Sequence, residues 1–205
     1  MLLYVHPENP QPRSIKQIVE CLKDGGVIIY PTDTIYGLGC SIFHHKAIER
    51  IYRIKQIDPR NAKLSFICHD LSDLSAYTKS ISTPLYRMLN EYLPGPYTFI
   101  LPASKQVPKI LKSKKETIGL RIPDNQIACS IIRELTNPVL STSLPGEMVE
   151  DYTDPEVMYE NFGNIVDIVV HGGVGGMTPS TVVDCTTEPP TLVRQGLGPW
   201  QEAAA

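Results

Sequence analysis

The chain has 205 residues, 42% hydrophobic and 20% charged, which is enough apolar material for one core of ordinary domain size and too much for a disordered chain. Its 19 basic and 22 acidic residues leave a formal net charge of −3, which excludes a uniformly basic nucleic-acid binder, so any basic site must be local. Because no apolar run reaches the roughly 18 residues of a membrane span and the five cysteines form no Cys-x-x-Cys pair, we expect one cytoplasmic domain over 1–205 with no membrane segment or metal site.

Apolar spacing and punctuation by Pro and Gly predict alternating helices and strands along the chain. In chain order the pattern predicts a helix over 14–23, a strand over 27–30, a helix over 47–55, a strand over 64–68, a short helix after Asp70, a helix over 82–92 and a strand over 97–101. A strand over 117–122, a helix over 124–135, a strand over 138–141, a weaker helix over 154–162 and strands over 165–170, 180–184 and 191–194 follow. The alternation predicts an α/β fold with helices packed on a mixed sheet.

The segment from Tyr30 to Cys40 carries the chemistry of the sequence. It leaves a buried strand as Pro31-Thr32-Asp33-Thr34, a run that suits neither helix nor sheet, and we expect a loop that turns on the following two glycines. Such a loop can present two hydroxyls, a carboxylate and a phenol from a rigid base. An ordinary turn held by its own side chains is an equally good interpretation of these residues alone.

The sequence does not match either of two familiar nucleotide-binding motifs. The chain has no Gly-x4-Gly-Lys-Ser/Thr run, which excludes the P-loop. The glycine-rich segment 172–176 follows a strand but is not followed by a helix, so a flexible turn is favoured over a cofactor loop.

The Thr32 region and five later segments, taken together, resemble the YrdC/YciO family over about residues 13–198. The family hallmark, Pro-Thr-Asp/Glu-Thr-x-Tyr-Gly-Leu-Gly, is matched almost letter for letter at 31–39. Further segments follow in family order: Leu-Pro-Gly-Pro-Tyr-Thr at 93–98, Gly-Leu-Arg-Ile-Pro at 119–123, Leu-Ser-Thr-Ser at 140–143, Pro-Ser-Thr-Val-Val-Asp at 179–184 and Val-Arg-Gln-Gly at 193–196. The resemblance implies a single twisted mixed sheet with helices around an open, concave, basic cavity.

The resemblance also implies an activity. Family members of known activity are threonylcarbamoyl-adenylate synthases, which join L-threonine, bicarbonate and ATP, release pyrophosphate and serve the modification of adenosine 37 in tRNA. The expected cofactor set is ATP as substrate with Mg²⁺ held mainly by its phosphates, and no resident cofactor. The family is also described as binding double-stranded RNA or tRNA through a positive concave face, which is the alternative function.

Residue roles follow from the same resemblance. Lys55 and Arg121 match catalytic cations that bring two anionic reactants together. The threonine-binding residues would be Thr32, Thr34 and Tyr36. The nucleotide-binding residues would be Lys55, Arg60, Lys63, Ser141, Ser143, Ser180, Thr181 and Arg194.

This chain departs from the family pattern at two positions. Ile57 stands where synthases carry an arginine, and Pro145 where they carry an asparagine. Arg60 or Lys63 from the neighbouring loop is expected to replace the missing arginine.

The RNA alternative would use a run of lysines, for which a solvated linker is the competing interpretation. These are Lys105, Lys109, Lys112, Lys114 and Lys115. A related carbamoyl or acyl adenylate enzyme that uses another amine is a third possibility, and the sequence does not indicate the oligomeric state.

Overall fold

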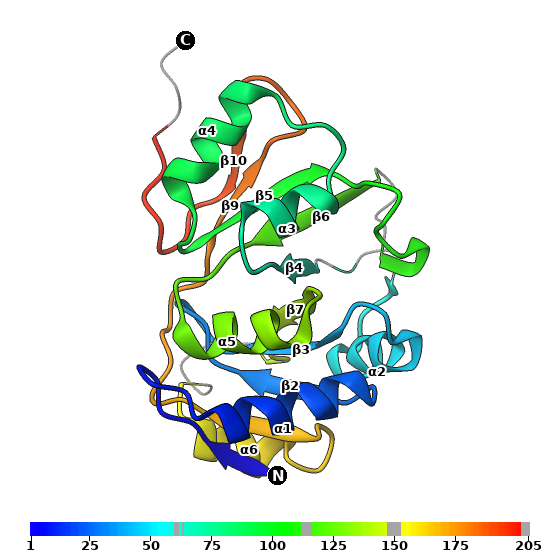
Figure 1. The fold of residues 1–205 in the computed structure, drawn as a ribbon, viewed down its shortest axis with the longest axis vertical. Coiled ribbons are helices and arrows are strands. Elements are labelled where there is room, and N and C mark those ends of the chain that lie inside the picture. Colours follow the sequence, from blue (N-terminus) through cyan, green and yellow to red (C-terminus); the bar gives the residue numbers. More distant parts are fainter. Residues whose placement is uncertain (60–61, 63, 112–115, 147–152, 202–205) are drawn as a thin grey trace.

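A ten-stranded mixed sheet runs the length of the protein in the computed structural model (Figure 1). The structure describes residues 1–59, 62, 64–111, 116–146 and 153–201. The strand order is β1-β8-β2-β3-β7-β4-β6-β5-β9-β10. The strands are β1 (Leu2–Tyr4), β2 (Val27–Tyr30), β3 (Gly37–Ser41), β4 (Ser65–Ile67), β5 (Tyr97–Pro102), β6 (Thr117–Arg121), β7 (Val139–Ser143), β8 (Ile168–His171), β9 (Thr181–Asp184) and β10 (Thr191–Arg194).

Helices cover both faces of this sheet and create two apolar cores. The helices are α1 (Pro12–Lys23), α2 (His45–Lys55), α3 (Leu71–Ala76), α4 (Thr83–Tyr92), α5 (Gln126–Leu135), α6 (Pro155–Phe162) and the 3₁₀ helix η2 (Lys109–Leu111). The buried residues of α1 and α5 pack with Ile28, Tyr30 and Val139 in one core. Those of α2, α3, α4 and α6 belong to the other core, with Phe66, Leu120 and Leu140.

Strand alternation explains the two cores. Phe66, Leu120 and Leu140 are neighbours across the sheet and share one face, while Ser65, Gly119 and Ser141 share the opposite face. Helices α1 and α5 cover that second face at the β2 and β8 end, where Ile28 and Ile168 pair. The small residues of this face mark the region in which the candidate site lies.

The α/β fold and most of its elements are confirmed, with shifts at the ends. The first helix begins at Pro12 rather than Ser14, with proline in its first turn and Gln11 as the capping position. Asp70 does cap its short helix, because its side chain accepts the backbone N–H of Asp73. None of the described helices is both long and apolar enough to cross a membrane.

The expectation of a loop through Gly37 and Gly39 is wrong, since these residues belong to β3, which is buried throughout. Its two glycines are explained by close packing against β7 and against Tyr30 on β2: a Cβ atom would lie 2.9 Å from Ser141 Oγ at Gly37 and 2.7 Å from a Val139 methyl group at Gly39. A Cβ atom at Gly37 would lie 3.1 Å from the Tyr30 ring, and one at Gly39 would lie 3.0 Å from it. The strand therefore needs glycine because β7 and the Tyr30 ring leave no room for a side chain, although glycine is a poor strand former.

Candidate functional site

The floor of the candidate site is a row of small residues that crosses four strands. Gly39 pairs with Ser141, Ser141 with Ser65, and Ser65 with Gly119 in the sheet register. Residues at the same level of neighbouring strands point to the same face, and three of the four, Gly39, Ser141 and Gly119, are buried there. Larger polar side chains stand around it, on the loop after β2, the ends of β6 and β7, and strands β5 and β9.

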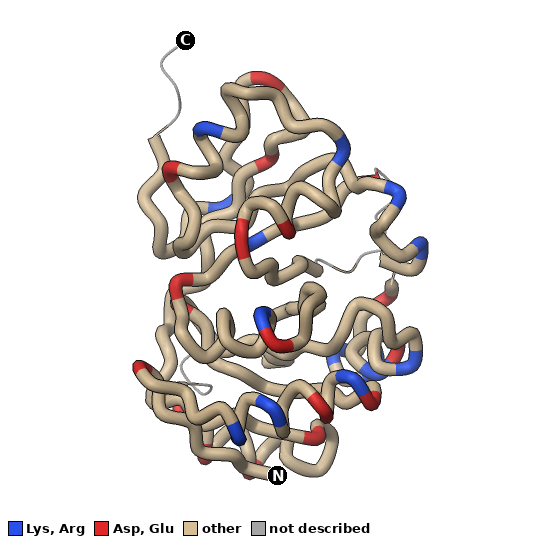
Figure 2. Tube along the Cα trace, in the orientation of Figure 1, with Lys and Arg blue, Asp and Glu red and all other residues tan. Residues whose placement is uncertain are grey.

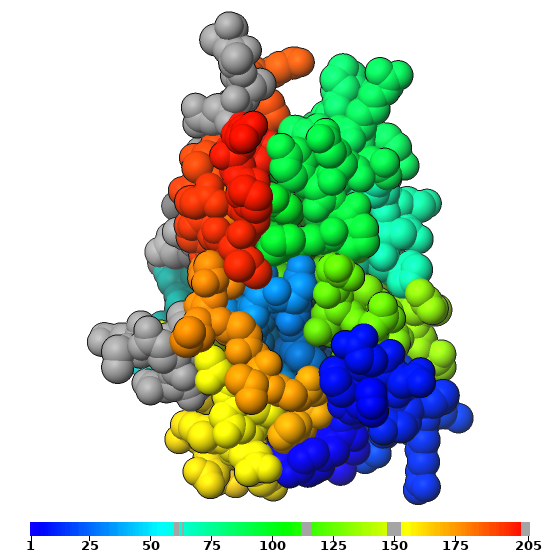
Figure 3. Space-filling view, turned by 90° about the vertical axis from the view of Figure 1, so that its left-hand side faces the viewer, coloured from blue at the N-terminus to red at the C-terminus, as the bar shows by residue number. Residues whose placement is uncertain are grey.

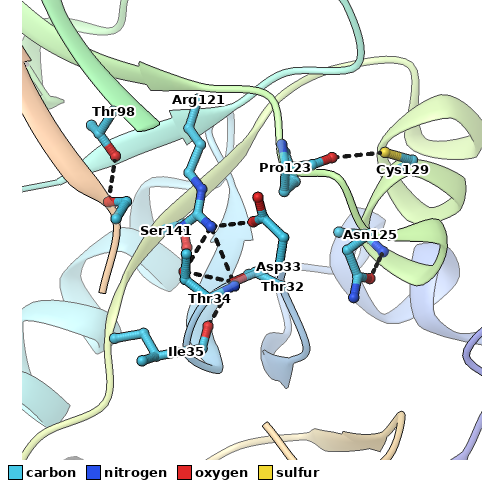
Figure 4. Close-up of polar contacts among 12 residues, drawn as sticks. Thr32, Asp33, Thr34, Ile35, Thr98, Arg121, Pro123, Asn125, Cys129 and Ser141 are labelled. Carbon is cyan, nitrogen blue, oxygen red and sulfur yellow. Dashed lines mark hydrogen bonds and ion pairs between the residues drawn. The ribbon is translucent and has the colours of Figure 1, made fainter. Parts of the chain in front are cut away.

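The loop that follows β2 meets the end of β6 at Arg121. The Nη2 atom of Arg121 donates to Thr34 Oγ1 at 2.7 Å and to Thr32 Oγ1 at 3.3 Å, and forms an ion pair with Asp33 Oδ1 (Figure 4). The loop has its own support, because Thr32 Oγ1 also donates to the Ile35 carbonyl at 2.7 Å. Light-blue atoms of the segment after β2 are visible in Figure 3 between orange atoms near residues 172–181 and yellow-green atoms of the α5 region.

The Asp33–Arg121 pair is almost fully buried. The two side chains are 9% and 8% exposed. Contact runs through one nitrogen and one oxygen rather than through the two parallel hydrogen bonds of a bidentate pair. Asp33 Oδ2 and Arg121 Nε are buried and have no hydrogen-bond partner among the described residues.

Arg194, the last residue of β10, contacts Ser180. Its Nη2 donates to the Ser180 carbonyl at 2.8 Å, and the Ser180 hydroxyl is 2.8 Å from Thr98 Oγ1. Burial, and to a smaller extent the positive charge of Arg121, lower the pKa of Arg194. No acidic partner of Arg194 occurs among the described residues.

Lys55 enters the site from the last turn of α2. Its Nζ donates to Ser143 Oγ at 3.2 Å and to the Leu144 carbonyl at 3.0 Å. Partial burial lowers the pKa of this ammonium. Lys55 thus has neutral partners, and no carboxylate pairs with it in the described part of the chain.

The hydroxyl groups of two tyrosines, Tyr30 and Tyr36, form hydrogen bonds around the site. Tyr30 OH donates to Ser141 Oγ at 2.8 Å, and burial raises the pKa of this phenol to about 12, so it stays protonated. Because Ser141 accepts that bond, its own hydrogen is free to point elsewhere. Tyr36 OH donates to the Gly173 carbonyl at 2.7 Å and accepts from Gly172 N–H at 3.1 Å.

The glycine-rich segment 172–176 is packed tightly against the site loop. Gly176 N–H donates to the Thr34 carbonyl at 2.9 Å. A Cβ atom would lie 2.3 Å from that carbonyl at Gly176 and 2.6 Å from the Tyr36 ring at Gly175. The segment is therefore closely packed against the loop, whereas the sequence favoured a flexible turn.

The remaining expected site residues divide into three groups. Thr181 is fully buried and its hydroxyl accepts from Gly196 N–H and donates to the Gly198 carbonyl, so in this structure it fastens the C-terminal segment and faces no open space. Lys105 and Lys109 are exposed, and Figure 2 shows basic and acidic residues interspersed over the coloured trace. The predictions for Arg60, Lys63, Lys112, Lys114 and Lys115 lie outside the described residues.

The residues described here contain no group of three or more His, Cys, Asp or Glu side chains that could hold a metal ion. The donors around the site are hydroxyls and cations, which suit phosphate and carboxylate groups better than a metal ion. Any Mg²⁺ would therefore be carried by the ligand's phosphates.

Sequence reasoning missed three participants in this cluster. Asp33 was noted as part of the loop but given no role, although an acid between two threonines could have suggested a counter-ion. Tyr30 precedes the loop and Thr98 ends a segment shared with the family, yet only the structure brings them to Ser141 and Ser180.

Comparisons with known proteins agree on one family. The family model Sua5_yciO_yrdC, described as "Telomere recombination", matches residues 20–196. "Uncharacterized protein YciO" of Escherichia coli K12 is 44% identical over 198 residues, covering 95% of both proteins. The crystal structure of E. coli YciO superposes with a TM-score of 0.90 at 43% identity, covering 97% of each chain.

More distant relatives have names that state an activity or a ligand. "Threonylcarbamoyl-AMP synthase" of Coxiella burnetii is 31% identical over 178 residues, covering 85% of this chain and 94% of the relative. The crystal structure of P. abyssi Sua5 complexed with L-threonine has a TM-score of 0.85 at 26% identity. That match covers 96% of this chain and 57% of the Sua5 chain.

Proposed function

This chain belongs to the Sua5/YciO/YrdC family, and we propose that it joins L-threonine, bicarbonate and ATP into threonylcarbamoyl-AMP, pyrophosphate and water for use in tRNA modification. Relatives named threonylcarbamoyl-AMP synthase and the Sua5 structure complexed with L-threonine support this activity. The carbamate of threonine would attack the α-phosphorus of ATP and displace pyrophosphate.

The observation that carries the proposal is the connected set of cations and hydroxyls from distant parts of the chain. Lys55 contacts Ser143, which shares strand β7 with Ser141. Arg121 contacts Thr32 and Thr34, and Arg194 contacts Ser180, whose hydroxyl meets Thr98 on the strand next to that of Arg121. A reaction between a carbamate and a triphosphate needs such a set, because the two anions repel each other until cations hold them in place.

The roles divide by chemistry. Lys55 and Arg194 would hold phosphate oxygens, and the hydroxyls of Ser141, Ser143 and Ser180 would donate to phosphate or ribose. Thr32 and Thr34 would line the place of the amino acid. Mg²⁺ would accompany the triphosphate and neutralise part of its charge.

Pyrophosphate release tests the activity. Purified protein is expected to release pyrophosphate only when ATP, threonine and bicarbonate are all present. Lys55→Met is expected to abolish the release, whereas Lys46→Met, an exposed lysine on the same helix, is expected to preserve it. Absence of threonine-dependent release at saturating substrate refutes the proposal; release driven by another amine would indicate a related adenylate-forming enzyme.

An RNA-binding role is the second candidate, because Lys105 and Lys109 are both exposed in the segment between β5 and β6. Backbone recognition by lysines gives a steep dependence of affinity on salt, since counterions are released from the phosphates. Titration of tRNA at several salt concentrations tests it with the double variant Lys105→Gln/Lys109→Gln. A flat salt dependence, or unchanged affinity in that variant, excludes these lysines.

A further inference from the structure

Tyr30 is a polar residue in an apolar core, and its hydroxyl reaches a residue of the candidate site. The side chain is 1% exposed and packs among the aliphatic residues that α1 and α5 bring to the sheet. Phenylalanine would fill this space equally well and would bring no polar atom that needs a partner. The phenol has one hydrogen-bond partner among the described residues, Ser141 Oγ at 2.8 Å. The reason for a tyrosine at this position therefore lies at Ser141.

The sheet has room for this contact because the strand between the two residues carries glycines. Tyr30 lies on β2 and Ser141 on β7, and β3 separates these two strands. A Cβ atom on β3 would lie 3.1 Å from the Tyr30 ring at Gly37 and 3.0 Å from it at Gly39. Glycine weakens a strand, so two of them in a buried strand are unfavourable unless close packing requires them. The glycines leave the space through which a side chain of β2 reaches β7.

Burial fixes the direction of this hydrogen bond. The phenol has a single hydrogen, and Ser141 Oγ is its one acceptor in the described part of the chain. A bond donated by Ser141 instead would leave a buried phenol O–H without an acceptor, which is unfavourable. Burial also raises the pKa of Tyr30 to about 12, so the phenol keeps its hydrogen at neutral pH. Ser141 therefore accepts from Tyr30 and directs its own hydrogen elsewhere.

The surroundings of Ser141 favour an anionic acceptor for that hydrogen. Ser143 lies two residues further along β7, on the same face of the sheet, and accepts from Lys55 Nζ at 3.2 Å. Lys55 has no acidic partner among the described residues. Ser141 is 5% exposed, so water competes weakly for its hydrogen bonds. A shielded O–H donor close to an uncompensated cation suits a phosphate oxygen.

We propose that Tyr30 is a positioning residue of the nucleotide site, which donates to Ser141 and thereby holds the Ser141 hydroxyl as a donor to a phosphate oxygen. This inference rests on the proposed function and chooses phosphate over ribose as the partner of Ser141. A serine hydroxyl that rotates freely donates or accepts, whereas Ser141 held in this way only donates. Because the hydroxyl is ordered before the ligand arrives, less conformational entropy is lost on binding.

A double-mutant cycle in ATP affinity tests the role. ATP is titrated by calorimetry, without threonine or bicarbonate, into wild type, Tyr30→Phe, Ser141→Ala and the double variant. Ser141→Ala is expected to weaken binding about 10- to 150-fold, the range for a hydrogen bond to a charged group, and Tyr30→Phe about 3- to 10-fold, since Ser141 is present but no longer held. In the Ser141→Ala background, Tyr30→Phe is expected to change affinity by less than about twofold. Equal losses in the two backgrounds, or no loss in the wild-type background, overturn the proposal.

Nucleotide analogues identify the partner of Ser141. Tyr30→Phe is expected to weaken the binding of ATP, 2′-deoxyATP and 3′-deoxyATP by the same factor, because all three carry the triphosphate. Disappearance of the loss with either deoxynucleotide assigns Ser141 to the ribose and overturns the proposal. The control is Tyr97→Phe, which removes another buried phenol that donates to the Pro199 carbonyl at 2.9 Å, and it is expected to leave ATP affinity within about twofold.

Steady-state kinetics separates positioning from general damage to the strands. Tyr30→Phe is expected to raise the KM for ATP and to leave the KM for threonine, measured at saturating ATP, within about twofold. A loosened β2 would disturb the loop after it and raise both KM values alike, and that result overturns the proposal. Thermal unfolding verifies that each variant is folded.

Failure of this inference and failure of the proposed function give different results. Threonine-dependent pyrophosphate release together with unchanged ATP affinity in Tyr30→Phe leaves the function standing and removes the positioning role. ATP binding that depends on Tyr30 through Ser141, without threonine-dependent release, supports the positioning role and removes the synthase activity. Absence of ATP binding by the wild-type protein overturns both.

Discussion

Removal of Arg121 is the most informative perturbation of stability. In Arg121→Met the carboxylate of Asp33, only 9% exposed, loses its ionic partner, and Thr34 loses a donor at 2.7 Å. Breaking a buried ion pair from one side costs about 3–5 kcal/mol, because an uncompensated charge stays buried. For a domain of this size that corresponds to a fall in Tm of about 6–20 °C.

A double-mutant cycle separates the pair from the general cost of mutation. Asp33→Asn should destabilise the wild-type protein but stabilise the Arg121→Met variant, since it removes the charge that the first change left unpaired. The expected coupling is at least about 1 kcal/mol, measured by denaturant unfolding of the four proteins. Additive effects would refute the reasoning that the two charges are held by each other.

An exposed ion pair in the same protein provides the control. Lys79 Nζ lies 3.8 Å from Glu116 Oε2, and the side chains are 59% and 63% exposed. Solvent screens such a pair, so the cycle of Lys79→Met and Glu116→Gln should give a coupling below about 1 kcal/mol. A coupling as large as that of the buried pair would show that burial is not its cause.

Three further predictions concern the edges of the site. Lys55 binds phosphate only when charged, and burial lowers its pKa from the usual 10.5, so ATP affinity should fall as the pH rises through a value below 10.5. In Lys55→Arg the fall in affinity should move to higher pH, and an unchanged pH profile would contradict the assignment. Tyr36→Phe removes two buried hydrogen bonds to Gly172 and Gly173, which should lower stability by about 1–3 kcal/mol and speed hydrogen exchange in the glycine-rich segment, with uniform exchange as the contrary result. Pro145→Asn introduces a side-chain amide next to Leu144, whose carbonyl accepts a hydrogen bond from Lys55. The variant should bind ATP about 5- to 10-fold more tightly, and equal affinity would mean that the amide does not reach the nucleotide.

The loop after β2 shows which parts of the structure the local sequence pattern predicts and which it does not. A continuous apolar run followed by proline predicts that a buried strand ends at Tyr30 and that Thr32 to Thr34 form a loop, and both are found. The same pattern treats Gly37 and Gly39 as a turn, because glycine disfavours strands. Close packing against β7 and Tyr30 overrides that preference, and packing between strands is not visible in local spacing.

The family motifs predicted which residue types would matter but not their partners. Arg121 and Thr34 were both expected at the site from the resemblance, and they are in contact although 87 residues separate them. Asp33 was given no role, because its importance depends on Arg121 lying beside it. Likewise, only the three-dimensional structure shows that Arg121 has an acidic partner whereas Lys55 and Arg194 have none among the described residues.

The amino-acid sequence by itself determined the α/β class, most helices and strands, and the family, because apolar periodicity, capping residues and ordered motifs are local properties of the chain. The tertiary structure decided the order of ten strands, the strand character of 37–41 and the pairing of Asp33 with Arg121. The physical reason is that register and burial arise from contacts between segments far apart in the chain, and a buried charge acquires its role from whichever opposite charge the sheet brings to it.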